Sequence, residues 1–133
     1  MRKDTLNLKN GYITLISVLV ISAISISVTI SLLLLGLGSS RTSFAVQQSD
    51  QAKGLADACA EEGLEQIRSD VNFVGNGNLI LGNGTCTYNV VNNGGQNRTI
   101  DATGTVDSVI RKVSVIINDI NPLIVVVSWQ EVP

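Results

Sequence analysis

The stretch GYITLISVLVISAISISVTISLLLLGLGSS occupies residues 11–40 and contains no charged side chain. Arg2, Lys3 and Lys9 precede it. As a helix, residues 12–37 would rise about 39 Å at roughly 1.5 Å per residue, whereas the hydrocarbon layer of a membrane is about 30 Å thick. The segment is therefore long enough to span a membrane. Because basic flanking residues stay in the cytoplasm, we expect everything after Ser40 to be exported.

Two simpler interpretations of this segment remain open. A removable secretory signal has an apolar centre of about 7–15 residues, followed by a small-residue cleavage site. The apolar run here is about twice that length, and residues 36–40, Gly-Leu-Gly-Ser-Ser, match an A-x-A site poorly. The second interpretation is an uncleaved signal anchor, which would make the chain a membrane-anchored extracytoplasmic binding module.

Residues 9–17, Lys-Asn-Gly-Tyr-Ile-Thr-Leu-Ile-Ser, resemble the processing site of type IV prepilins and type II secretion pseudopilins. In that family a short basic leader ends in Gly, a prepilin peptidase cleaves after this Gly, and the new N-terminal aromatic residue is N-methylated. The resemblance implies cleavage between Gly11 and Tyr12 and N-methylation of Tyr12. It also implies that the apolar segment is retained and packs among other pilin subunits in a bacterial filament.

One position departs from the family pattern. Most members carry Glu four residues after the aromatic residue, where it neutralises the terminal ammonium of a neighbouring subunit. That place holds Ile16 here, or Ser17 if a one-residue shift is allowed. A carboxylate in an apolar environment is costly unless it is paired. The missing Glu argues against a major, repeating subunit and favours a minor subunit, including one placed at the filament tip.

Hydroxyl side chains interrupt the apolar segment, and their role has two interpretations. Ser22, Ser25 and Thr29 fall at i, i+3 and i+7. Small hydroxylated residues on one face let helices approach closely in lipid. Alternatively, each hydroxyl donates to a carbonyl of its own helix. The spacing fits both interpretations equally.

Residues 39–70 have the pattern of an amphipathic helix. We expect Gly36 and Gly38 to loosen the helix ahead of it, because glycine weakens helices, and the following serines to restart it. Apolar and small residues then recur at steps of three and four: Ala52, Leu55, Ala56, Cys59, Ala60, Gly63, Leu64 and Ile67. Acidic residues lie mostly off this stripe, and we interpret them as a solvated face: Asp57, Glu61, Glu62 and Glu65.

Residues 71–133 have the pattern of four or five short antiparallel strands joined by turns. Asn-Gly pairs at 76–77 and 83–84 and the run at 92–95 are turn signals. Alternating residues form apolar rows between them: Cys86, Tyr88 and Val90; Ile100, Ala102 and Val106; Val109, Val113, Val115 and Ile117; Val125, Val127 and Trp129. The predicted fold class is α+β, with a long N-terminal helix packed on a small antiparallel sheet. The pilin resemblance implies the same arrangement.

The chain has two cysteines, Cys59 and Cys86. If both are exported, they lie where disulfides persist, and a bond between them would stabilise this small domain by about 3–4 kcal/mol in the chain-entropy model. Two free buried thiols are the alternative. A metal site is not expected, because the chain has no histidine and two cysteines do not make a zinc set.

The remaining chemistry of the sequence is sparse. Without histidine there is no Ser/His or Cys/His constellation, so we expect no enzyme activity, no cofactor and no small-molecule substrate. A net charge of −2 argues against strong nucleic-acid binding. The expected organisation is a leader at 1–11, a hydrophobic helix at 12–38, an amphipathic helix at 39–70 and a sheet domain at 71–133. We expect a single-pass inner-membrane protein that later joins a cell-surface or periplasmic filament.

Overall fold

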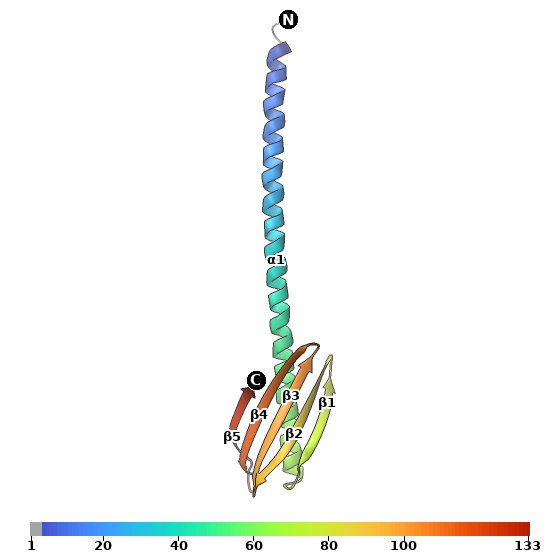
Figure 1. Cartoon of the computed structure of the whole chain (residues 1–133), viewed down its shortest axis with the longest axis vertical. Helices are drawn as coiled ribbons and strands as arrows, with labels where there is room; N and C mark the ends of the chain where they lie inside the picture. The colour runs from blue at the N-terminus through green and yellow to red at the C-terminus, as the bar shows by residue number, and fades with distance from the viewer. Residues whose placement is uncertain (1–3) are drawn as a thin grey trace. The chain divides into compact units, whose positions relative to one another are not determined.

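The computed structural model describes residues 4–133, with side chains from Gly11 onward. The elements in chain order are α1 (Asp4–Ser69), β1 (Gly75–Leu81), β2 (Gly84–Gly94), β3 (Asn97–Val106), β4 (Val109–Asp119) and β5 (Val125–Val132), as Figure 1 shows. Of the predicted basic leader, Arg2 and Lys3 lie outside the described residues. The chain divides into two compact units, Met1–Ser43 and Phe44–Pro133.

Helix α1 is continuous through Gly36 and Gly38, so the expected loosening at these residues is wrong. Each glycine weakens a helix by only about 1 kcal/mol relative to alanine. The leucines at 32–35 and 37 are strong helix formers, and the Thr42 hydroxyl donates to the Gly38 carbonyl at 3.1 Å. The local preference for helix therefore outweighs the two glycines.

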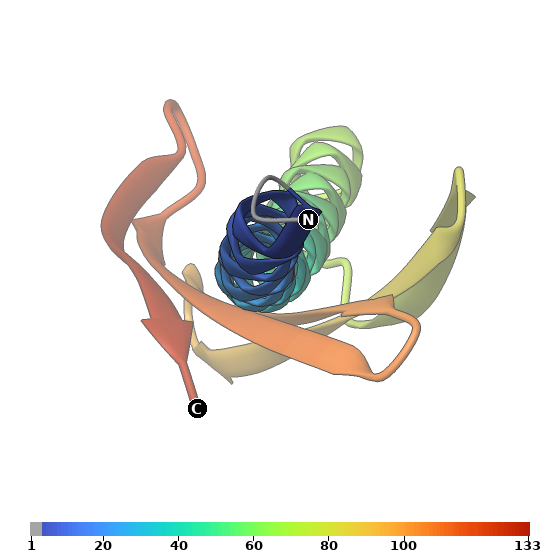
Figure 2. The same cartoon turned by 90° about the horizontal axis from the view of Figure 1, so that it is seen from above.

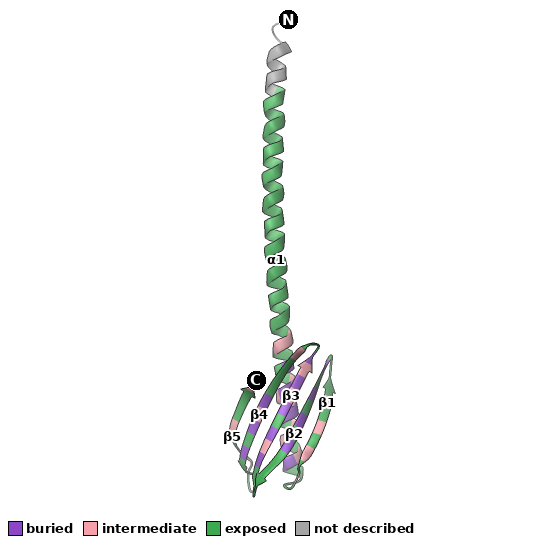
Figure 3. Ribbon diagram, in the orientation of Figure 1, coloured by how far each residue is buried: buried purple, intermediate pink, exposed green. Residues whose placement is uncertain are grey.

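The α+β fold class is confirmed in the second unit, where an antiparallel sheet packs on α1. The sheet has five strands in the order β1-β2-β3-β4-β5, so each strand pairs with its neighbour in sequence. Figure 2 shows the sheet curved, and Figure 3 shows buried residues alternating with exposed ones along the central strands. This alternation identifies one covered face of the sheet and one exposed face.

The core of this unit is the interface between α1 and the covered face of the sheet. The predicted stripe on the helix is confirmed, because Ala52, Ala56, Cys59, Ala60 and Ile67 are fully buried. The predicted rows on β2, β3 and β4 supply the opposite side: Cys86, Tyr88, Val90, Ile100, Ala102, Val106, Val113, Val115 and Ile117. Small residues dominate the helix side, so the helix lies close to the sheet.

The predicted row on β5 is wrong, because β5 does not alternate regularly. The register jumps from Ile116 opposite Ser128 to Ile117 opposite Val126, which leaves Val127 as an extra residue in a bulge. A bulge shifts the alternation of side chains by one position. Val125, Val127 and Trp129 are all exposed, at 46%, 64% and 39%, and of the three only Trp129 lies opposite a core residue, Val115.

Candidate functional site

The main candidate surface is the apolar segment, which we define as residues 12–37 of α1. Its large apolar side chains are all exposed, from Ile16 at 41% to Leu35 at 72%. By length and composition this part of α1 can cross a membrane. A continuous apolar surface of this size is not stable in water, so this segment needs lipid or other proteins around it.

The hydroxyl groups of the apolar segment are bonded within the helix. Six of them donate to the carbonyl three or four residues earlier, at 2.7–2.9 Å: Ser17, Ser22, Ser25, Ser27, Thr29 and Ser31. Of the two arrangements that the sequence allowed, this is the one in which each hydroxyl donates to a carbonyl of its own helix. It satisfies the polar groups without a partner helix, as a segment surrounded by hydrocarbon requires.

The predicted processing site lies within α1. Gly11 and Tyr12 are both helical and exposed, and a Cβ atom built on Gly11 would meet nothing within 4 Å. Neither packing nor backbone strain therefore explains a glycine at position 11. Cleavage after Gly11 and methylation of Tyr12 stay predictions, and Ile16 occupies the place of the family's Glu one turn further along.

A disulfide joins α1 to the sheet. The expected bond between Cys59 and Cys86 is present, with Cα atoms 6.0 Å apart. The two cysteines are 0% and 1% exposed, respectively. Cys59 lies in the middle of the buried helix stripe and Cys86 lies in β2, so the bond crosses the centre of the core.

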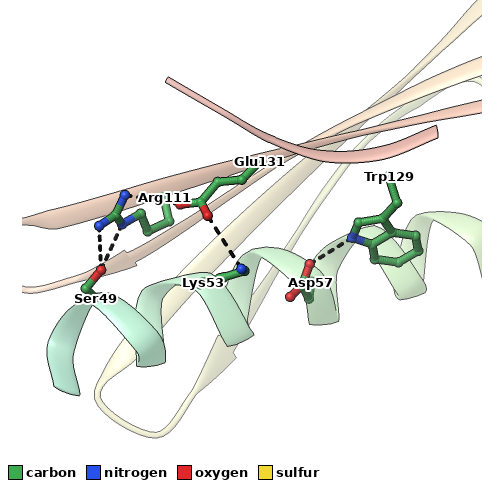
Figure 4. A network of polar contacts seen from close by, with 6 residues as sticks. All are labelled: Ser49, Lys53, Asp57, Arg111, Trp129 and Glu131. Carbon is green, nitrogen blue, oxygen red and sulfur yellow. Dashed lines mark hydrogen bonds and ion pairs between the residues drawn. The ribbon is translucent and has the colours of Figure 1, made fainter. Parts of the chain in front are cut away.

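Polar contacts join α1 to β4 and β5 at the edge of this core (Figure 4). The Arg111 guanidinium donates to the Ser49 hydroxyl at 2.6 and 2.9 Å and to the Glu131 carboxylate at 3.1 Å. Lys53 lies 3.5 Å from the other oxygen of Glu131. The Trp129 indole donates to Asp57 at 3.0 Å. We call these six residues the rim contacts: Ser49, Lys53, Asp57, Arg111, Trp129 and Glu131.

The acidic residues of α1 have ordinary structural roles. Glu65 accepts a hydrogen bond from Arg68, three residues later on the helix, at 3.2 Å. Glu62 accepts from Gln66 at 2.9 Å.

Burial raises the pKa of the Tyr88 hydroxyl above its ordinary value, and the negative charge of Glu62 adds to this effect. Among the described residues, no group of three or more potential ligands is placed to hold a metal ion.

Arg98 is the one charged residue that is buried in the described part of the chain, at 2% exposure. Its guanidinium donates to the side chain of Asn92 and to the carbonyls of Gly95, Asn97 and Val71 at 2.8–3.0 Å. Val71 follows the end of α1, whereas Asn92 lies near the end of β2, Gly95 in the turn after it and Asn97 at the start of β3. Arg98 therefore joins the end of the helix to this turn.

We expect Arg98→Ala to lower the free energy of unfolding by about 2–4 kcal/mol, because it leaves several carbonyl groups without a donor. Arg68→Ala removes an exposed arginine from the same end of α1 and serves as the control, with an expected loss of at most about 0.5 kcal/mol. Denaturation curves of the full chain in detergent measure both values. Equal midpoints for the two variants would contradict this role of Arg98.

The sequence did not reveal the rim contacts, the role of Arg98 or the close approach at Gly104. A Cβ atom built on Gly104 would lie 2.6 Å from the Ala56 nitrogen and would overlap the Ala52 carbonyl oxygen. The only sequence signal for these features was indirect. Gly104 interrupts a strand pattern, which indicates close backbone approach, and Arg98 closely follows the turn signal at 92–95.

Comparisons with models of protein families, with curated proteins and with solved structures found no match for this chain.

Proposed function

We propose that this chain is a minor structural subunit of a type IV pilus or a pseudopilus-like filament. It is made as a precursor, cleaved after Gly11 by a prepilin peptidase and assembled through its apolar segment. The observation that carries this proposal is the exposed apolar segment, which continues in the same helix into a sheet-covered amphipathic part. A subunit that passes from lipid to a filament requires such a surface, and the resemblance of residues 9–17 to a prepilin processing site favours this use over a plain membrane anchor.

The internal bonding of the hydroxyl groups supports the same role. A subunit of this kind has to be stable first in hydrocarbon and then against neighbouring helices. Because the six serine and threonine hydroxyls are satisfied by their own helix, the change of surroundings breaks none of these hydrogen bonds. In this proposal the basic leader stays in the cytoplasm and the unit Phe44–Pro133 faces the outside of the inner membrane.

The position of Ile16 supports a minor role within the filament. An exposed isoleucine replaces the carboxylate that most family members present to the terminal ammonium of a neighbour. A subunit without this carboxylate does not need a partner below it to neutralise a buried charge. This property suits a subunit that starts a filament or occupies its tip.

The continuity of α1 before Gly11 favours a second candidate function. Residues 4–10 are helical and join the apolar segment without a break, as in an anchor that keeps its N-terminus. In that case the chain is an uncleaved membrane-anchored binding module, and its exported unit binds a partner outside the cytoplasm.

Mass spectrometry of the mature protein separates the two functions. For the filament subunit we expect a chain that begins at Tyr12 and carries one N-methyl group. Gly11→Ala should leave most of the protein as the unprocessed precursor in the membrane, because the family resemblance implies that the peptidase requires Gly before the cleaved bond. Gly36→Ala is the matched control, since an added Cβ meets nothing within 4 Å at either glycine. An intact N-terminus in both the wild-type protein and the control would overturn the proposal.

A further inference from the structure

The helix side of the core has few large side chains. Ala52, Ala56, Ala60 and Cys59 are fully buried, and Gly63 is also buried. Among the residues of α1 from Gly11 onward, Ile67 is the one large residue that is completely buried, at the far end of the stripe. Small side chains bury little apolar surface, and the hydrophobic contribution to stability is proportional to that surface. The attraction between α1 and the sheet therefore comes mainly from the large side chains of the sheet, together with Leu55 and Leu64 of α1, which are partly buried against them.

The polar contacts between α1 and the sheet add little to this attraction, apart from the part-buried hydrogen bond from Arg98 to Val71 just after α1. The rim contacts and the Gln48–Asp107 hydrogen bond at 2.8 Å are exposed to solvent. Exposed ion pairs and hydrogen bonds contribute little to stability because water competes for the same groups. The Cys59–Cys86 bond is the one covalent connection between α1 and the sheet in the described residues, and it lies at the centre of the interface.

We propose that the Cys59–Cys86 bond is a redox lock, which decides whether α1 stays on the covered face of the sheet. In the reduced chain the two elements separate, and the sheet exposes its apolar face. Oxidation closes the lock by thiol–disulfide exchange: the two thiols form the disulfide, and a small disulfide oxidant accepts two electrons and two protons and becomes two thiols. Folding of the unit Phe44–Pro133 is thereby coupled to arrival in an oxidising compartment.

Once formed, the Cys59–Cys86 disulfide is protected from reductants by its burial. A thiolate has to reach a sulfur atom to reduce the bond, and both cysteines are almost completely buried. Reduction therefore requires that the core around the bond first open locally. The oxidised unit should keep its disulfide in a reducing solution for as long as it stays folded. The coupling of folding to an oxidising compartment rests on the proposed export of the unit Phe44–Pro133. The dependence of helix docking on the disulfide does not rest on that export.

The single tryptophan makes this proposal testable. Trp129 on β5 donates to Asp57 on α1, so its fluorescence reports whether the two elements are in contact. Two samples of the full chain in detergent are prepared. The first is treated with dithiothreitol in native buffer. The second is treated with dithiothreitol in urea and then returned to native buffer with the reductant still present. We expect no reduction in the first sample. In the second we expect red-shifted emission and protease cleavage within the sheet, both reversed by oxidised glutathione.

Two variants complete the test. Cys59→Ala with Cys86→Ala should behave like the reduced protein under all conditions, which excludes an effect of the free thiols. Gln48→Ala loses only an exposed hydrogen bond and should behave like the oxidised wild-type protein. Recovery of native emission and protease resistance in the reduced wild-type chain would overturn the lock. The N-terminal mass measurement is independent of this result, so the lock and the filament role can fail separately.

Discussion

Gly104→Ala is expected to lower the free energy of unfolding of the unit Phe44–Pro133 by about 3 kcal/mol or more, a cost typical of severe overpacking in a core. The added methyl group would overlap the Ala52 carbonyl oxygen and lie 2.6 Å from the Ala56 nitrogen. Both atoms belong to the helix backbone, which cannot move aside as a flexible side chain can. The strand and the helix therefore have to separate, and the disulfide at the centre of the interface limits that movement.

The same substitution at Gly54 is the matched control. Gly54 lies on α1, and an added Cβ meets nothing within 4 Å. Alanine favours a helix over glycine by about 0.5–1 kcal/mol, so Gly54→Ala should be stabilising. Urea denaturation of the full chain in detergent, followed by Trp129 fluorescence, measures both variants. A loss of stability in Gly54→Ala, or none in Gly104→Ala, would show that the helix is not held as closely as described.

Ile24→Asp combined with Val28→Asp is expected to release the protein from the membrane. The two positions lie one helical turn apart, near the middle of the apolar segment, and both side chains are exposed. Insertion scales assign about 2.5–3.5 kcal/mol to each aspartate at the centre of a spanning helix. The pair should therefore cost about 5–7 kcal/mol, enough to reduce insertion severely. The measurement is the fraction of protein that remains with membranes after alkaline extraction.

Phe44→Asp combined with Val46→Asp is the control for this experiment. Both residues are exposed and apolar, but they follow Arg41, the first charged residue after the uncharged stretch. We expect this variant to stay in the membrane fraction like the wild-type protein. If the two double variants partition alike, the apolar segment is not what holds the chain in lipid.

The helix stripe and most strand faces could be predicted because they depend on local periodicity. The stripe from Ala52 to Ile67 follows the helical repeat, and the rows through Tyr88, Ile100 and Val115 follow the alternation of a strand. Both repeats arise from backbone geometry, which is independent of tertiary contacts. The disulfide followed from a shared compartment and from the apolar faces on which Cys59 and Cys86 lie.

The failures arose where the local pattern does not determine the outcome. The bulge at Val127 shifts a side-chain row by one residue, and it depends on how β5 pairs with β4. The helix continues through Gly36 because the surrounding leucines decide the conformation. The rim contacts join residues far apart in the chain, such as Ser49 and Arg111. No periodicity in the sequence encodes such a pair.

The inward bonding of the serine and threonine hydroxyls has a consequence for movement. From Leu15 to Leu37, this part of α1 presents almost only carbon to its surroundings, because its six hydroxyl groups are bonded within the helix. Rotation of such a helix about its own axis, or sliding past a neighbour, breaks none of these hydrogen bonds. In the proposed transfer from lipid to a filament, the helix can therefore move in small steps.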